Sequence, residues 1–462
     1  MSTAPFHDLR PWLRHLAETD RLTITKPGVK LKHEVAAIAK RLQHDSAVLC
    51  PSPDGHDIPV MANLLCHRSW FAEALGVSES DLLERYRTAA ENPIACNEVS
   101  EAPAQEVVHE EVDINRLLPV PTHNELDSGP YITAALLISR NPRTGEQNVA
   151  IHRCQVSGPN RIGLLLLPRH TLAFHRVAEE AGDALDVALV IGIDPLTLLS
   201  SQAIAPLGQD ELEIAGALHG RSLDVVKCRS NEVRVPANSE IVLEGRLLPK
   251  TFEPEGPFGE FPQYYGARSN QHVIEVDVVT HRRNPIFHTI LGGGMEHLLL
   301  GAVPREATVL SLLKRSFPNV RDVHLTQGGV CRYDLVVKIE KRSEGEAKNV
   351  ILGAFGAHYD IKHVTVVDTD VDIHNPNDVK WAVSTRFQAD RDLVVVSGAQ
   401  GSKLDPSTDK GVSAKMGLDA TIPLEADEFT FKRIRVPGED EVDLDALAHP
   451  DSASLVTQML GD

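Results

Sequence analysis

The sequence predicts an α+β protein built from a small N-terminal α/β subdomain, a strand-rich middle and a C-terminal α/β domain. Three patterns support this prediction. Apolar residues recur at helical spacing near the N-terminus, short β-rich runs crowd residues 131–279, and strand-like and helix-like segments alternate after residue 319. With 462 residues and 42% apolar composition, the chain can bury a sizeable core and is long enough for two or three domains.

Residues 1–115 are expected to form the N-terminal subdomain and a connector. Apolar spacing predicts helices over 8–17 and 35–42. A Ser-x-x-Asp pattern resembling a capping box predicts a third helix over 78–92. The acidic, aperiodic run at 100–113 leads into a proline-rich segment and is therefore interpreted as the connector.

The middle of the chain, residues 116–303, is dominated by short β-rich runs such as YITAALLIS, LDVVKCR, EIVLEG and HVIEVDVV. Helix-like insertions interrupt these runs at 173–181 and 212–218. Strands at this density predict a barrel or a folded antiparallel sheet.

A helix is predicted at 306–316. It belongs to a linking segment, residues 304–318, that is expected to join the middle region to a C-terminal α/β domain over 319–440. The polar segment 402–417 is predicted to be a loop. Residues 441–462 are expected to form a tail helix that docks on a neighbour or frays.

Charge and cysteine usage exclude several classes of partner and fold. A formal charge of -19, from 65 acidic and 46 basic residues, argues against nucleic acid or an anionic membrane as a general partner. The six cysteines are scattered without a C-x-x-C pair, which disfavours a zinc cage or a disulfide scaffold. No signal core or long apolar stretch is present, so we expect a soluble, cytoplasmic protein.

The segment EPEGPFGEFPQYYG places Glu255 and Glu260 on either side of a turn rich in glycine and proline. Two carboxylates held close to a cation can adopt different protonation states, so that one stays charged while the other keeps a proton to deliver. Taken alone, the pattern fits a solvated surface turn at least as well, because exposed glutamate is the norm.

A second group of polar residues is a candidate ligand set for a hard or borderline divalent ion. Asn148 and Arg153 lie five apart in NVAIHR, and His170 and Glu211 follow in LPRH and QDELEIAG. An amide oxygen, an imidazole and a carboxylate suit Mn²⁺ or Mg²⁺. Among 21 histidines, however, a single one such as His170 is usually a structural group.

A series of ordered motifs favours a functional role for both the glutamate pair and the candidate metal ligands. Together these motifs resemble the UbiD family of decarboxylases from about residue 119 to 421. The resemblance rests on DSGPYITAALLISR, NVAIHRCQ, a histidine before a helix, DELEIAGAL, EGPFGEFPQYYG, WAVSTRFQAD and KMGLDAT, in this order. It implies a split β-barrel flavin-binding domain between the N-terminal subdomain and a C-terminal α/β oligomerisation domain. It also implies a homodimer or a hexamer of dimers.

The resemblance assigns roles to individual residues. Glu260 would be the proton shuttle to the substrate carbon, oriented by an ion pair between Arg153 and Glu255. The implied cofactors are prenylated FMN, supplied by a flavin prenyltransferase, together with Mn²⁺ or Mg²⁺ and K⁺. The metal ligands would be Asn148, His170 and Glu211, and the cofactor-contacting positions Thr133, Ile151, Arg153, His170, Ser201 and Lys415.

The implied cofactor suits the implied chemistry, the reversible non-oxidative decarboxylation of an aromatic or heteroaromatic acid. Loss of carbon dioxide from an sp² carbon would leave an unstabilised carbanion, so an electron sink must first bond to that carbon. Prenylated FMN would be this covalent sink, and Glu260 would then protonate the carbon.

Substrate choice depends on His297, Arg305 and Arg332. Strand alternation over 331–340 places Arg332 on the face away from the packed side, where it is either a solvent-exposed or ion-paired arginine or part of a site. If the three converge, they would bind a second carboxylate or a ring heteroatom. This resembles the branch acting on furan dicarboxylate and pyrrole-2-carboxylate, so a furan- or pyrrole-type acid is the preferred substrate.

Three alternatives stay open. One is a different substrate: a hydroxybenzoate, a polyprenyl hydroxybenzoate or an indole carboxylate. Another is a catalytically silent flavin-binding subunit, although the presence of Arg153, Glu255 and Glu260 argues against this. An ordinary flavin reductase on a split barrel would bind unmodified flavin.

Overall fold

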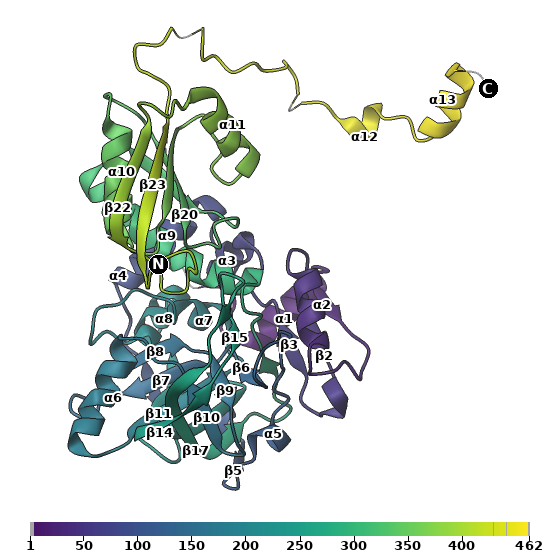
Figure 1. The fold of residues 1–462 in the computed structure, drawn as a ribbon. Helices are drawn as coiled ribbons and strands as arrows, with labels where there is room; N and C mark the ends of the chain where they lie inside the picture. The colour runs from purple at the N-terminus through teal and green to yellow at the C-terminus, as the bar shows by residue number, and fades with distance from the viewer. Residues whose placement is uncertain (1–3, 428, 440, 461–462) are drawn as a thin grey trace. The chain divides into compact units, whose positions relative to one another are not determined.

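The computed structural model describes residues 4–427, 429–439 and 441–460. The chain divides into two units, Met1–Thr421 and Ile422–Asp462, which are described separately (Figure 1). All six cysteine thiols are free. None of the helices in the described part of the chain has the length and apolar content of a bilayer-spanning segment.

The N-terminal helices form where the apolar spacing predicts them. Helix α1 buries Leu9, Trp12 and Leu16, and the Asp8 side chain caps it by accepting from Arg10 N at 3.1 Å. The predicted capping box at 78–92 is wrong, because the Ser78 hydroxyl donates to the Asp81 carboxylate and a 3₁₀ turn precedes the helix. The elements are α1 Leu9–Glu18, α2 Glu34–Leu42, α3 Arg68–Leu75, α4 Leu82–Glu91, β1 Leu22–Ile24, β2 Ala47–Cys50 and β3 Val60–Ala62, with the sheet order β1-β2-β3-β18.

The predicted folded antiparallel sheet is confirmed as a nine-stranded sheet that curls into a half-barrel (Figure 1). Its path is β6-β9-β10-β17-β14-β11-β7-β8, and β5 pairs with β17. The segment 100–113 is therefore more than a connector, because it contributes this strand. The strands of the sheet are β5 Val107–His109, β6 Tyr131–Ile132, β7 Leu136–Arg140, β8 Gln147–Ile151, β9 Cys154–Val156, β10 Arg161–Leu164, β11 Leu185–Ile191, β14 Ile241–Glu255 and β17 Ser269–His281.

Helix α6 packs against β14, β11 and β7 of this sheet, and α8 packs against its last strand, β8. Both helix-like insertions are confirmed as α6 and α8, each beginning one to three residues before the predicted start. The hairpin of β15 and β16 follows the long strand β14 directly. The remaining elements of the middle region are α5 Ile114–Leu117, α6 His170–Ala181, α7 Pro195–Ser200, α8 Glu211–His219, β4 Asn97–Val99, β12 Asp224–Lys227, β13 Arg234–Pro236, β15 Phe258–Gly259, β16 Tyr265–Gly266 and β18 Phe287–His288.

Helix α9, Met295–Ser316, begins eleven residues before the predicted helix at 306–316. Pro304 lies inside this helix, although proline lacks the backbone N–H that an interior turn uses. The longer helix carries His297, Gly301 and Arg305 at intervals of four residues and therefore places them on one face.

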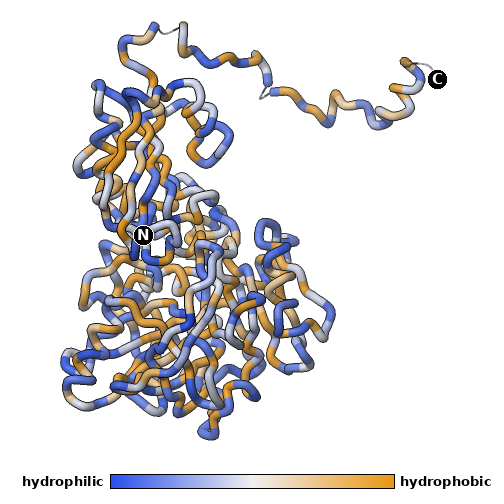
Figure 2. The backbone as a smooth tube through the Cα atoms, in the orientation of Figure 1, coloured by the Kyte–Doolittle hydropathy of each residue, from blue (hydrophilic) through white to orange (hydrophobic). Residues whose placement is uncertain are grey.

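The C-terminal domain is a five-stranded sheet in the order β19-β20-β21-β23-β22, with parallel central pairs and antiparallel edges. The predicted loop at 402–417 is wrong in its second half, which is part of β23. The buried positions of β23 include Ser413, Lys415 and Gly417, so its sequence lacks the apolar alternation that would predict a strand. Figure 2 shows hydrophobic stretches along the strands. The elements are β19 Val320–Leu325, β20 Asp334–Ile339, α10 Glu346–Ala357, β21 His363–Asp368, α11 Pro376–Arg386, β22 Leu393–Gln400 and β23 Val412–Ala420.

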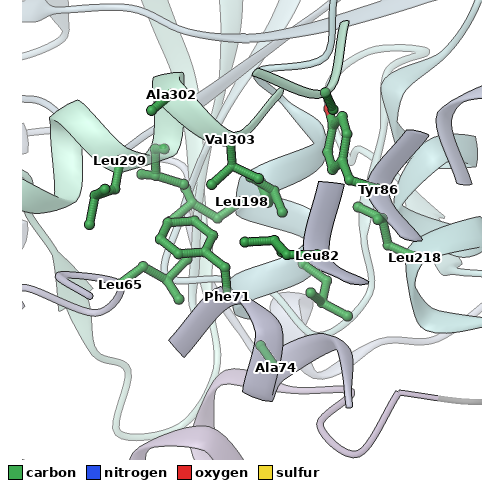
Figure 3. Close-up of a cluster of buried hydrophobic side chains, with 14 of the residues drawn as sticks. Leu65, Phe71, Ala74, Leu82, Tyr86, Leu198, Leu218, Leu299, Ala302 and Val303 are labelled. Atoms are coloured by element: carbon green, nitrogen blue, oxygen red, sulfur yellow. The ribbon is translucent and has the colours of Figure 1, made fainter. Parts of the chain in front are cut away.

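One hydrophobic cluster joins the N-terminal helices to the middle region. In Figure 3, Phe71 of α3 and Leu82 of α4 pack with Leu198 of α7 and Val303 of α9. This cluster continues into the C-terminal sheet at Leu335. Because packed side chains hold α8 and α9 from both sides, the side chains that these helices carry toward the site are fixed in position.

The second unit, Ile422–Asp462, carries two short helices, α12 Leu444–Leu447 and α13 Ser452–Leu460, where a single tail helix was expected over 441–462. No residue of either helix is buried.

Candidate active site

An arginine bridges two carboxylates at the end of the long strand β14. Arg153, in the turn between β8 and β9, donates through one guanidinium nitrogen to Glu255 Oε2 at 2.7 Å and through the other to Glu260 Oε1. The Glu255 side chain is fully buried, and those of Arg153 and Glu260 are 10% and 12% exposed. The surface-turn reading is therefore wrong for these two glutamates.

Tyr131 fixes the other side of Glu255. It was not predicted as a site residue from the sequence. Its hydroxyl donates to Glu255 Oε1 at 3.0 Å and accepts from Gly256 N at 3.1 Å. Arg153 also lies over the Phe258 ring, with 5.6 Å between the guanidinium carbon and the ring centre. Glu255 thus has a partner on each oxygen, whereas among the described residues the Glu260 carboxyl is hydrogen-bonded to Arg153 alone.

Burial and charge act on this network in opposite directions. Burial raises the pKa of Glu260, although the positive charge of Arg153 opposes the shift and the neighbouring Glu255 adds to it. Burial works against the charge of Arg153, but Glu260 and Glu255 together hold the pKa of that guanidinium above its ordinary value. The network therefore contains a permanent cation beside a carboxyl that can hold a proton.

Asn148, His170 and Glu211 converge around β8. His170, the first residue of α6, places its Nδ1 3.1 Å from Asn148 Oδ1. Glu211, the first residue of α8, accepts from Val149 N at 2.7 Å. Burial raises the pKa of Glu211 to about 8. No three His, Cys, Asp or Glu side chains are grouped as metal ligands in the described residues, so this set depends on the Asn148 amide oxygen.

These three side chains fit a divalent cation. A buried carboxylate with a raised pKa lacks a compensating positive charge, and a bound cation would supply it. Amide oxygen, imidazole and carboxylate are all ligands of Mn²⁺ and Mg²⁺.

The other expected cofactor positions have different surroundings. Thr133 is buried, and its Oγ1 lies 3.1 Å from Thr289 Oγ1. Ile151 is the last residue of β8, two positions before Arg153. Ser201, just after α7, donates its hydroxyl to Leu198 O at 2.7 Å. Lys415 of β23 donates to Tyr359 O at 2.9 Å, and burial lowers the pKa of its amine.

Arg332 is not where the strand alternation predicts it. It lies in the turn before β20, is 5% exposed, and donates to Leu298 O of α9 at 3.2 Å. Its guanidinium packs across Gly301, where an added Cβ would meet it at 1.7 Å. The guanidinium also lies 5.4 Å from the centre of the Phe261 ring, directly after Glu260.

His297, Arg305 and Arg332 therefore form one group on and against α9, in which Arg332 is buried and His297 and Arg305 are half-buried. Burial, followed by the nearby Arg332 and Arg305, lowers the pKa of His297 to about 3, so this imidazole is neutral at pH 7. Burial and the charge of Arg305 lower the pKa of Arg332 to about 9. Arg305 Nε is buried without a hydrogen-bond partner among the described residues. Crowded, desolvated guanidinium groups of this kind favour a bound anion.

Further charged residues near this group carried no signal in the sequence. Arg169 donates to the Tyr359 hydroxyl at 2.8 Å. Burial raises the pKa of Asp360, against the charges of Arg305, Arg332, Arg169 and Lys415. Burial and the same cations lower the pKa of His358 to about 3.

A cavity of about 520 Å³ opens beside the β15–β16 hairpin and is lined by Glu260. This volume lies within the range of small-molecule sites. His123 and the exposed Tyr264 and Tyr265 contribute to its wall, as do His33, the N-cap of α2, and Lys40 in the last turn of that helix. None of these five lining residues was predicted as a site residue from the sequence.

Three family models match the chain in order. They are the N-terminal, Rift-related and C-terminal domains of 3-octaprenyl-4-hydroxybenzoate carboxy-lyase, over residues 13–90, 97–295 and 298–420.

Curated relatives are similar over most of their length. The anhydromevalonate phosphate decarboxylase of Methanothermobacter thermautotrophicus is 36% identical over 89% of this chain and 96% of its own. The gallate decarboxylase of Lactiplantibacillus plantarum is 32% identical over 81% and 83%. Both relatives are named as decarboxylases.

Among solved structures, the UbiD-class enzyme HmfF of Pelotomaculum thermopropionicum in complex with FMN is 48% identical, with a TM-score of 0.94 over 95% of this chain and all of its own. An evolved dimeric form of HmfF in complex with prenylated FMN has a TM-score of 0.90 and is 45% identical, over 96% of this chain and all of its own. With its three domain models matched in order and this likeness along almost its whole length, the chain belongs to the UbiD family of carboxy-lyases.

Proposed function

We propose that this protein uses prenylated FMN to decarboxylate, reversibly, a furan- or pyrrole-type carboxylic acid. One observation carries the proposal: Arg153 joins the buried Glu255 to Glu260, whose raised pKa lets it hold a proton beside a cavity. When bound, the flavin would supply an electron sink for the breaking C–C bond. Other small unsaturated acids remain the alternative substrates.

The protein's own groups would then handle the proton. Glu255, held by Tyr131 on one oxygen and by Arg153 on the other, fixes the direction of the guanidinium. Arg153 in turn orients the Glu260 carboxyl. Glu260, with no second partner among the described residues, is free to turn and to protonate the substrate carbon once carbon dioxide has left.

Asn148, His170 and Glu211 would hold Mn²⁺ or Mg²⁺, and the cation would pair with the flavin phosphate. Ser201, at the end of α7, stays the expected contact for K⁺. Thr133, Ile151 and Lys415 would contribute further contacts to the flavin. We further propose a homodimer or a hexamer of dimers, with a flavin prenyltransferase supplying the cofactor.

We expect Glu211→Gln to remove the effect of Mn²⁺ on flavin affinity, because the amide cannot neutralise a divalent cation. In fluorescence titrations, Mn²⁺ should tighten FMN binding to the wild-type protein, and the variant should bind FMN about 10- to 100-fold more weakly in Mn²⁺. Glu213→Gln, on the same helix, is the matched control. An unchanged Mn²⁺ effect in Glu211→Gln would remove Glu211 from the metal site.

The group of His297, Arg305 and Arg332 would bind the second carboxylate of a diacid or a ring heteroatom. Its support is the burial of Arg332 and the buried Arg305 Nε, which has no hydrogen-bond partner among the described residues. The neutral His297 would act through a ring N–H or lone pair rather than through charge.

We expect Arg332→Met to lower activity toward a dicarboxylic acid much more than activity toward the corresponding monocarboxylic acid. A charge-assisted hydrogen bond contributes about 1.5–3 kcal/mol, so kcat/KM for furan-2,5-dicarboxylate should fall about 10- to 150-fold. The value for furan-2-carboxylate should change little. Arg321→Met, on the surface strand β19, is the control. Equal losses for both acids would assign Arg332 to packing.

The proposed function is tested by co-expression with a flavin prenyltransferase, mass spectrometry of the bound cofactor and a panel of acids scored for carbon dioxide release. The panel contains furan, pyrrole, hydroxybenzoate and indole carboxylates, together with anhydromevalonate phosphate, which is named for the archaeal relative. Release from a hydroxybenzoate or an indole acid alone would correct the substrate. Loaded cofactor without any release would indicate a silent subunit, and unmodified flavin a reductase.

A further inference from the structure

Three buried side chains form a hydrogen-bonded chain that ends at Thr133. His123 Nε2 lies 2.7 Å from Thr289 Oγ1, which lies 3.1 Å from Thr133 Oγ1. Ile290 N donates to the same Thr133 oxygen at 3.0 Å. All three side chains are less than 10% exposed. His123 lines the cavity that Glu260 also lines, so the hydrogen-bonded chain begins beside the candidate active site.

The surroundings of His123 decide which ring nitrogen carries the proton. Burial lowers the pKa of His123 to about 4, so the ring is neutral at pH 7, with one N–H and one lone pair. Nδ1 is buried without a hydrogen-bond partner among the described residues. A buried N–H without an acceptor costs more than an unused lone pair. The proton therefore lies on Nε2, which donates to Thr289.

The direction of the remaining bonds follows from counting protons. Thr289 accepts from His123, and Thr133 is the other group within reach of its hydroxyl among the described contacts. If Thr133 donated to Thr289, the Thr289 proton would be buried without an acceptor. If Thr289 donates, Thr133 accepts from both Thr289 and Ile290, and its own proton is left for a ligand.

We infer that His123 and Thr289 are positioning residues which fix the Thr133 hydroxyl as a hydrogen-bond donor toward the bound flavin. This inference rests on the proposed function, which gives Thr133 a flavin contact. The flavin atom opposite Thr133 must then be an acceptor, a carbonyl oxygen or a ring nitrogen with a lone pair. Tyr131, two residues earlier, donates to Glu255, so both hydroxyls of this short segment would act as donors in the site.

The chain is tested by Thr289→Val, which keeps the shape of the side chain and removes the hydroxyl. We expect the variant to bind FMN about three- to tenfold more weakly and to shift the absorption maximum of bound FMN, because Thr133 is no longer held in the donor orientation. Thr289→Ser restores the hydroxyl and should restore both readouts. A loss of packing alone would lower the melting temperature without this rescue.

A second measurement uses the wild-type protein without flavin. A long-range ¹H–¹⁵N spectrum of the histidine rings, with the His123 signals identified by their loss in His123→Gln, should show the proton on Nε2. A proton on Nδ1 would overturn the inference whatever the protein's activity. Unchanged FMN affinity and spectrum in Thr289→Val would overturn it as well, while FMN binding by the wild type leaves the proposed function intact. Failure of the wild type to bind FMN would instead count against the proposed function and, with it, the flavin contact of Thr133.

Discussion

Glu260→Gln should abolish measurable decarboxylation while the protein still binds flavin. The glutamine amide keeps the size of the side chain and can still accept from Arg153, but it has no acidic proton to deliver to the substrate carbon. Loss of a general acid typically costs about 10²–10⁴-fold in rate. The measurement is carbon dioxide release by the loaded enzyme, with flavin content determined from absorbance in the same sample.

Glu253→Gln is the matched control for this prediction. Glu253 lies on β14 and, like Glu260, pairs with an arginine: Arg161, at 2.7 Å. Its side chain, however, is 33% exposed. This variant should retain activity within about twofold, because exposed ion pairs contribute little. Full activity in Glu260→Gln would remove Glu260 from the proton step and leave the proposed mechanism without its acid.

Arg153→Met should be strongly destabilising as well as inactive. The substitution leaves Glu255 fully buried without its cation, although Tyr131 remains as a partner. Removing one partner of a buried ion pair costs about 3–5 kcal/mol. We expect this loss in the free energy of unfolding, measured by urea denaturation of the flavin-free protein at pH 7.

Arg161→Met is the matched control for Arg153→Met, because it also removes an arginine that pairs with two glutamates, but at an exposed site. Arg161 pairs with Glu253 and Glu275, and all three side chains are about one third exposed. Its removal should change the free energy of unfolding by about 0–1 kcal/mol. Similar losses in the two variants would mean that the Arg153 network is solvated in solution, which would contradict its role in fixing the Glu260 carboxyl.

Local sequence patterns predicted elements best where one face of the element is apolar and buried. Helices α1 and α2 were found by their spacing because their buried residues are apolar. Strand β23 was missed because the side chains at its buried positions are polar or small, including Ser413, Lys415 and Gly417. Lys415 is also an expected flavin contact. Hydropathy alternation fails at a strand whose buried face carries polar groups.

Arg332 shows a second limit of these patterns. Alternation assigns faces only where the backbone is extended, but Val330 and Cys331 have φ angles of +50° and +52°, in the left-handed region. The turn directs Arg332 against α9, and Gly301 leaves room for it. Neither the turn nor the packing of these two segments can be derived from a period of two.

The sequence by itself determined the fold class, most of the helices and, through its ordered motifs, the UbiD family. It also placed Glu255 and Glu260 close together, because five residues in a tight turn cannot separate them far. Only the tertiary structure brought Arg153, about a hundred residues away, between them, and only it closed the chain from His123 to Thr133. The physical reason is that periodicity reports the local backbone, whereas contacts between distant segments depend on how sheets and helices pack as a whole.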